Sequence, residues 1–314
     1  MNIIKFLTPV NLEKEKEKFF SSDDYNPRLE YSWKKDEIES WLQKDSKYSS
    51  LYKVIFDQNE IGIVEEAKKI FFTTIDEDLM SVAEDAVKKL PPPLPMYSLD
   101  AVVREFQKIL SYFDLNYEVF ISDSQGFNIR PHPALRKIEI GKEMNMQFFS
   151  PEGEVKHELV HVLRYENGKY NNIEKSVEYL PTEEGLSSYF QDYKSEFGNI
   201  SLFQHAAEYT ATSVALKGSM RDVFNYLCSI GFDKENAWGR SIRHKYGFKD
   251  TSKPGDIMKP SMYFYHEQKI KQLTDKEKLR LMVGKIHQSE LDQYKEYKGK
   301  IPKQKLVDYY QLDI

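Results

Sequence analysis

The sequence predicts an α+β fold that is predominantly helical, with one small antiparallel sheet near its middle. Apolar residues recur at helical spacing through most of residues 1–90, and the same spacing returns from Ser150 onward. Between these regions, Tyr117–Ser122 and Leu135–Gly141 have the length and side-chain composition of strands. The segment Pro131–Pro133 predicts that the residues between the two strands form a loop.

The helices before the sheet are followed by a proline-rich connector. Apolar residues keep helical spacing from Asp76 to Leu90. Pro91–Pro95 cannot continue that helix and is predicted to be a stiff, extended spacer between helical layers. Ser98 then has the character of an N-cap for the next helix. These breaks predict three parts: an N-terminal helical region at 1–95, a core at 96–270 and a C-terminal helical region at 271–314.

Several helices after the sheet have recognisable ends. Ser150–Pro151 is typical of an N-cap and a first helical residue, and Asn167–Gly168 predicts the end of that helix. Thr182 is predicted to cap a second helix, because Pro181 disfavours helix at the residue before it. Thr274–Glu277 is a capping box. Further helices are predicted at Leu202–Leu216, Met220–Ile230 and Lys234–Arg243.

The composition excludes several classes of protein. With 40% hydrophobic and 30% charged residues in 314 positions, the chain can bury a large core and is not a disordered protein. A single cysteine, Cys228, excludes an internal disulfide and a thiolate zinc cluster. A net charge of −5 lacks the basicity of many nucleic-acid binders, and no apolar run is long enough to span a membrane. The N-terminus does not resemble a signal peptide, so we expect a cytoplasmic protein without nucleic-acid or membrane partners.

The most informative segment is His157-Glu158-Leu159-Val160-His161, an H-E-x-x-H motif inside a predicted helix. Residues four apart project from one helix face, so two imidazoles can supply half of a tetrahedral zinc site. Glu158 would then lie beside the metal-bound water, where it can act as general base. The alternative is a chance spacing of two packed or exposed histidines.

A third ligand is expected from a carboxylate pair. The other five histidines occur singly, without a partner at ligand spacing. Glu183 and Glu184 follow Thr182 and would lie in the first turn of a helix that can pack against the first. The alternative is that both carboxylates only complement the positive end of the helix dipole.

These residues resemble a known family, the bacterial QEGLA-motif proteins and their eukaryotic relatives, the microtubule-associated tyrosine carboxypeptidases. In that family, an H-E-x-x-x-H helix precedes a Q/E-E-G-L-A motif whose glutamate is the third zinc ligand. Here Glu183–Ser187 matches the second motif, and the resemblance places the ligand at Glu184. Weaker similarities, which extend the resemblance from about Tyr25 to about Gly299, occur at Tyr25–Tyr31, Lys217–Phe224, Arg240–Arg243, Ile257–Tyr263 and Gly284–Ile286.

The sequence departs from the family pattern at three places. Its histidine spacing is one residue shorter, which restores ordinary i, i+4 geometry, so we expect metal ligation to survive. Pro260 and His266 replace an aspartate and a glycine, and His244 replaces the glycine after Arg243. Because these changes fall in the substrate-binding half, substrate specificity is less transferable than zinc binding.

The resemblance implies a gluzincin-type zinc metallopeptidase with one Zn²⁺ per chain, held by His157, His161 and Glu184. It also implies a zincin-like core with the small antiparallel sheet beside the H-E-x-x-H helix. The expected activity is that of a carboxypeptidase that removes a C-terminal residue, tyrosine in the eukaryotic relatives, from a protein or peptide partner. The candidate substrate-binding residues, which would hold the terminal carboxylate or the developing oxyanion, are Arg240, Arg243, Lys259 and Tyr263.

Two other functions remain open at this stage. An endopeptidase would use the same chemistry on an internal peptide bond. A regulatory or binding protein would keep zinc for structure alone. The intact Glu158 argues against that second function, because a structural zinc site needs no general base.

Overall fold

The computed structural model describes residues 7–34, 36, 39–40, 43, 48–91, 97–123, 128–142, 150–194 and 200–314, and helices predominate among them. The chain divides into two compact units, each made from two separate stretches of sequence. The first unit is Met1–Leu90 with His205–Met262, and the second is Pro91–Gln204 with Tyr263–Ile314. The prediction divided the chain into three consecutive parts, whereas each unit here combines an early and a later stretch of the sequence. Most of the predicted proline spacer, Pro92–Pro95, lies outside the described residues.

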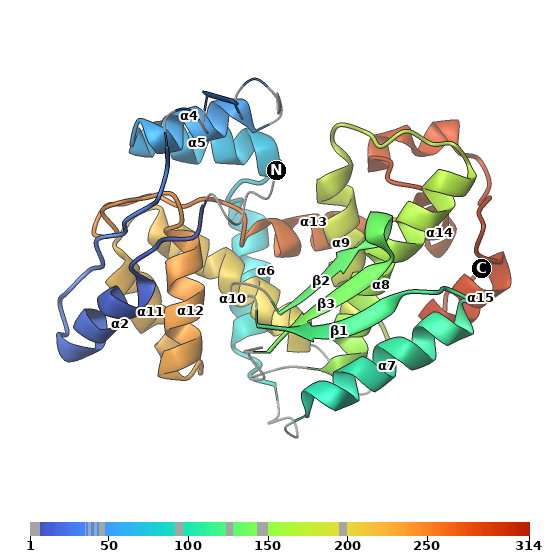
Figure 1. Cartoon of the computed structure of the whole chain (residues 1–314), viewed down its shortest axis with the longest axis horizontal. Coiled ribbons are helices and arrows are strands. Elements are labelled where there is room, and N and C mark those ends of the chain that lie inside the picture. Colours follow the sequence, from blue (N-terminus) through green and yellow to red (C-terminus); the bar gives the residue numbers. More distant parts are fainter. Residues whose placement is uncertain are drawn as a thin grey trace. The chain divides into compact units, whose positions relative to one another are not determined.

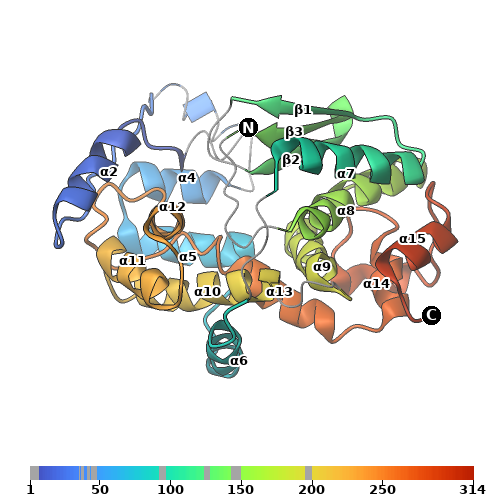
Figure 2. The same cartoon turned by 90° about the horizontal axis from the view of Figure 1, so that it is seen from below.

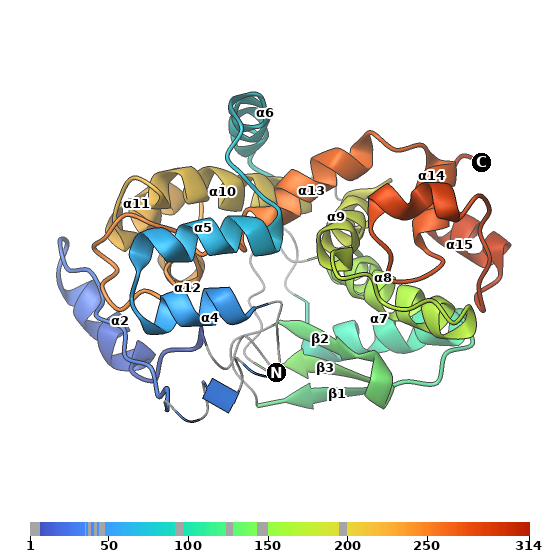
Figure 3. The same ribbon diagram turned by 90° about the horizontal axis from the view of Figure 1, so that it is seen from above.

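The first unit is helical among its described residues. Its helices α4 and α5 pack side by side, as do α11 and α12 (Figures 1 and 3). The Asp76 and Asp233 side chains accept hydrogen bonds at the N-termini of α6 and α12, and Ser219 forms a capping box at α11. The elements are α2 (Leu12–Ser21), α4 (Ser49–Phe56), α5 (Glu60–Phe71), α6 (Glu77–Val87), most of α10 (Ile200–Ala215), α11 (Met220–Ser229) and α12 (Lys234–His244).

The second unit contains the sheet and the helices that pack on it. Helices α7 (Leu99–Tyr112) and α8 (Pro151–Tyr170) lie on the same face of the sheet (Figure 2). Phe106, Ile138 and Leu159 belong to the fully buried core between them. The remaining elements are β1 (Glu118–Ser122), β2 (Ile129–His132), η1 (Pro133–Leu135), β3 (Lys137–Gly141), α9 (Tyr179–Asp192), α13 (Met262–Lys271), α14 (Asp275–Leu281), η2 (Gln288–Gln293) and α15 (Lys303–Tyr310).

The sheet has three strands in the order β1-β3-β2 and is mixed, so the prediction of an antiparallel sheet holds for one of its two strand pairs only. The two predicted strands, β1 and β3, pair in parallel, with Val119 opposite Ile138. The predicted loop contains β2, which pairs antiparallel with β3 and reverses the chain direction between them. Pro131 is tolerated in β2 because an edge strand leaves N–H groups without a ladder partner. Leu135 belongs to the short helix η1 and not to a strand.

Three predicted N-caps are confirmed. The hydroxyl groups of Ser98, Ser150 and Thr274 each accept a hydrogen bond from the first turn of α7, α8 and α14, respectively. The predicted end of α8 at Asn167–Gly168 was wrong, since this helix continues to Tyr170. Gly168 instead allows a close backbone approach, because a Cβ there would lie 3.3 Å from the Cα of Gly284.

The predicted start of α9 at Thr182 was also wrong, because the helix begins at Tyr179. Pro181 therefore lies in the first turn, where its missing N–H would have had no helical partner. The Thr182 hydroxyl accepts a hydrogen bond from the Gln288 backbone N–H at 3.0 Å and caps nothing. With this earlier start, Glu183 and Glu184 lie beyond the first turn, so the helix dipole does not account for the carboxylate pair.

Candidate metal centre

Two predicted ligands lie on α8, which the core of the second unit holds in place. Val155, Leu159 and Val162 are fully buried on one side of this helix. His157 and His161 lie one turn apart on another side, with ring centroids separated by 5.5 Å. Helix α9 packs closely against α8 and carries the third predicted ligand (Figure 1).

The three predicted ligands converge in the structure. The Glu184 Oε2 atom lies 3.5 Å from Nε2 of His157 and 3.6 Å from Nε2 of His161. Zinc bonds to nitrogen or oxygen are about 2.0–2.1 Å long, so two ligands of a tetrahedral zinc lie about 3.3–3.4 Å apart. Among the described residues, this is the only group of three metal-ligating side chains close enough to hold an ion. The donor set and its spacing therefore fit zinc.

Each imidazole is oriented by a second hydrogen bond at its Nδ1 atom. His157 Nδ1 is 3.0 Å from Oε1 of Gln191, whose amide donates to Glu154. His161 Nδ1 is 2.8 Å from Oε1 of Glu183. Both contacts favour a proton on Nδ1 and leave Nε2 free for a metal ion. No pattern in the sequence marks these roles of Gln191 and Glu183, because each contact joins side chains on two different helices.

The electrostatics of the site suit acid–base chemistry near neutral pH. Burial raises the pKa of the Glu158 carboxyl to about 7, against the opposing effect of His157 and His161. A general base works best when its pKa lies near the working pH. At Glu183, burial is outweighed by Lys285, His161 and Arg164, which hold the pKa of its carboxyl well below the usual range.

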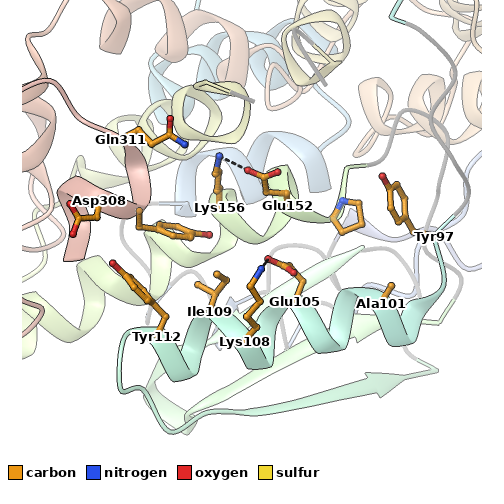
Figure 4. A pocket seen from close by; sticks show the side chains of 12 residues that line it. Tyr97, Ala101, Glu105, Lys108, Ile109, Tyr112, Glu152, Lys156, Asp308 and Gln311 are labelled. Carbon is orange, nitrogen blue, oxygen red and sulfur yellow. Dashed lines mark hydrogen bonds and ion pairs between the residues drawn. The ribbon is translucent and has the colours of Figure 1, made fainter. Parts of the chain in front are cut away.

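A separate pocket of about 610 Å³ in the second unit does not include the candidate metal ligands. It is lined by α7, the start of α8 and α15, with Tyr97, Tyr112 and Tyr309 among its residues (Figure 4). Lys156 directly precedes His157, but its side chain lines this pocket and pairs with Glu152. The candidate metal centre and this pocket therefore lie on different sides of α8.

In a comparison with known proteins, the chain is similar to proteins named tyrosine carboxypeptidases. No family model matches it. It is 27% identical over 298 residues to the human protein named "Putative tyrosine carboxypeptidase MATCAP2", an alignment that covers 93% of this chain and 46% of that protein. It is 28% identical over 271 residues to the mouse "Microtubule-associated tyrosine carboxypeptidase 1", with 82% of this chain and 54% of that protein covered.

The resemblance to the tyrosine carboxypeptidases is confirmed. The chain spans about half the length of these curated tyrosine carboxypeptidase relatives. Within the described ranges, every helix is too short or too polar to cross a lipid bilayer.

Of the substrate-binding residues that the tyrosine carboxypeptidase resemblance implied, Tyr263 lies in the same unit as the candidate metal ligands. Its ring centroid is 6.3 Å from that of His157. Gly185 explains how the helix that carries Tyr263 can approach so closely. A Cβ at Gly185 would lie 2.8 Å from backbone atoms of His266, so α13 and α9 touch at this glycine.

Three further candidates, Arg240, Arg243 and Lys259, belong to the first unit, whereas the candidate metal ligands belong to the second. Arg240 pairs with the buried Glu208, and Arg243 lies 3.8 Å from the same carboxylate with its side chain 44% exposed. Lys259 lies in the turn that precedes α13. The role of these three residues in substrate binding stays a prediction.

Proposed function

We propose that the chain is a zinc-dependent carboxypeptidase that removes one residue from the C-terminus of a peptide or protein. The observation that carries the proposal is the convergence of His157, His161 and Glu184 around one point, with Glu158 next to His157 on the same helix. The names of the curated relatives support exopeptidase activity at a C-terminus and suggest tyrosine as the residue removed.

The side chains of the site have distinct parts in this proposal. Two imidazoles and the Glu184 carboxylate would hold zinc, which when bound polarises the scissile carbonyl and acidifies water. Glu158 accepts a proton from the attacking water and delivers it to the leaving amine. Gln191 and Glu183 keep the two imidazoles in the orientation that ligation needs.

The remaining groups would recognise the substrate. Tyr263, near His157, is in a place to donate a hydrogen bond to the substrate or to the oxygen that gains negative charge. Arg240 and Arg243 both lie close to Glu208 in the first unit, so their proposed role at the terminal carboxylate rests on the resemblance alone.

Glu158→Gln tests the proposal, with Glu152→Gln as its control. Glu152 lies on the same helix but pairs with Lys156 in the separate pocket. We expect about one zinc per chain in both variants, and a rate that falls about 10²–10⁴-fold only in Glu158→Gln. Peptides that end in tyrosine, phenylalanine, leucine or glutamate should reveal the preferred residue.

Each peptide should be tested with a free and with an amidated C-terminus. A carboxypeptidase acts only on the free carboxylate, whereas an endopeptidase cleaves both forms. Zinc-loaded protein that releases nothing from any peptide would instead identify a non-catalytic zinc protein. Wild-type protein that takes up no zinc would overturn the proposal entirely.

A further inference from the structure

Glu183 is the centre of a buried hydrogen-bond network behind the metal ligands. Its Oε1 atom is 2.8 Å from Nδ1 of His161 and accepts a hydrogen bond from Nζ of Lys285 at 2.6 Å. Its Oε2 atom accepts a longer bond, of 3.4 Å, from Arg164. The carboxylate is 1% exposed. Two cations therefore fix the group that in turn orients a predicted zinc ligand.

The segment that supplies Lys285 is itself fastened to α8. The Arg164 guanidinium is fully buried and donates to the backbone carbonyls of Leu281, Gly284 and Ile286 at 2.6–3.0 Å. The close approach of Gly168 to Gly284 brings the two backbones together at the same place. Arg164 thus contacts both the 281–286 turn and Glu183, so the turn and the carboxylate share one anchor.

From this geometry we propose that Lys285 is a positioning residue for the metal centre. It holds the Glu183 carboxylate against His161 and so keeps the Nε2 atom of that histidine aimed at the metal. The inference rests on the proposed zinc site. A carboxylate that orients a ligand histidine typically contributes about 10–100-fold to metal affinity. Removing the cation that restrains this carboxylate should therefore lower the zinc affinity by a large part of this factor.

The chain offers a matched control in Lys300. Its Nζ donates to the buried Glu166, also on α8, at the same distance of 2.6 Å. Glu166 accepts its other hydrogen bond from Tyr117, and the described structure gives it no contact with a metal ligand. Lys300→Met therefore removes a comparable ion pair between the C-terminal segment and α8 and leaves the His161 side of the network intact.

The experiment measures zinc affinity by competition with a chromophoric chelator, in wild-type protein and in Lys285→Met, Lys285→Arg and Lys300→Met. We expect Lys285→Met to bind zinc about 10-fold or more weakly, Lys285→Arg to recover most of the loss, and Lys300→Met to stay within about 3-fold of wild type. The visible absorption of the Co²⁺-substituted proteins should shift in Lys285→Met alone. Equal affinities of wild type and Lys285→Met, or an equal loss in Lys300→Met, would overturn the role of Lys285.

A double-variant comparison keeps the test decisive if Lys285→Met is also less stable. Glu183→Gln should weaken zinc binding by itself, and adding Lys285→Met to it should cause little further loss, because both act through one contact. Additive losses would contradict the proposal. If the wild-type protein binds no zinc, the proposed function itself fails. If the wild-type protein binds zinc and Lys285→Met binds it equally well, only the inference about Lys285 fails.

Discussion

Two buried glutamates, Glu183 in the second unit and Glu208 in the first, have the same kinds of neighbours but different consequences. Each carboxylate contacts a histidine and an arginine. At Glu183 the histidine uses only Nδ1, and its Nε2 faces Glu184. At Glu208 the histidine is His244, whose two nitrogens both contact carboxylates.

The difference lies in whether a ring nitrogen is left over. His244 Nε2 is 2.8 Å from Glu208, and its Nδ1 is 2.6 Å from Asp256. A histidine held from both sides has no lone pair to offer a metal ion and serves to join buried carboxylates. A histidine held from one side is oriented for ligation. Burial beside a carboxylate therefore does not by itself mark a candidate metal ligand, whereas an Nε2 that faces a second carboxylate at ligand spacing does.

The largest expected effect separates the two histidines by metal content. His161→Ala should lower zinc from about one per chain to near zero, because it removes a ligand. His244→Gln should keep about one zinc per chain. Elemental analysis after removal of excess metal measures both. Zinc retained in His161→Ala, or lost as completely in His244→Gln, would contradict the comparison.

The next effect concerns the stability of the first unit. Glu208→Gln removes the carboxylate charge that faces Arg240 and Nε2 of His244, and breaking a buried ion pair costs about 3–5 kcal/mol. Tryptophan fluorescence during urea unfolding is selective for this unit, because the stretches that form the second unit contain no tryptophan.

Asp250→Asn is the control for that measurement. Asp250 pairs with the exposed Arg28 in the same unit, and exposed pairs contribute less than about 1 kcal/mol. A Glu208→Gln protein as stable as Asp250→Asn would mean that the Glu208 network does not hold this unit together.

A smaller effect should appear in the pH dependence of stability. Burial lowers the pKa of His244, but Asp256 and Glu208 outweigh it and raise that pKa to about 9. A folded-state pKa above the unfolded value of 6.5 gives a contribution that is complete below about pH 6.5 and is lost as pH rises through 9. The loss should be on the order of 1–3 kcal/mol.

The comparison of wild type with His244→Gln isolates that contribution. Burial lowers the pKa of the neighbouring Lys245 to about 8, which changes stability in the opposite direction over an overlapping pH range. Since Lys245 is present in both proteins, the difference in unfolding free energy between them, followed by tryptophan fluorescence from pH 6 to 10, should shrink as pH rises. A constant difference would show that His244 is not charged in the folded protein.

The smallest stability effect is expected at Arg243. Its side chain is 44% exposed and 3.8 Å from Glu208, so Arg243→Ala should change the free energy of unfolding by less than about 1 kcal/mol. If Arg243 binds the substrate carboxylate as predicted, the same variant should raise KM at least 10-fold. A KM within about 2-fold of wild type would remove Arg243 from the substrate site.

Local rules predicted the parts of this molecule that local interactions determine. The caps at Ser98, Ser150 and Thr274 follow from hydrogen bonds within one helical turn, and the i, i+4 placement of His157 and His161 follows from helix geometry. The resemblance to a known family selected Glu184 from the carboxylate pair, which spacing alone could not do. The structure assigns its neighbour Glu183 to the outer hydrogen bond.

Features that depend on distant partners escaped prediction. Pro131 is a strand residue because β2 pairs with the free edge of β3. Thr182 lies inside α9, and its hydroxyl accepts a hydrogen bond from the backbone N–H of Gln288, far along the chain. Gly168 was interpreted as a helix stop, but it lies inside α8, where its lack of a side chain allows the backbone of Gly284 to approach closely. In each case the deciding contact is with a segment whose position no local pattern reveals.

The anchoring of the 281–286 turn by Arg164 has a consequence for the order of events during translation. The chain is made N-terminus first, so His157 and Glu184 are synthesised on the order of 100 residues before Leu281–Ile286. Until then, Arg164 lacks its three carbonyl partners and Glu183 lacks Lys285. If the proposed zinc site is real, nascent chains stalled before residue 281 should therefore capture zinc more weakly than chains that include Leu281–Ile286. Tight metal binding would then follow the synthesis of this turn.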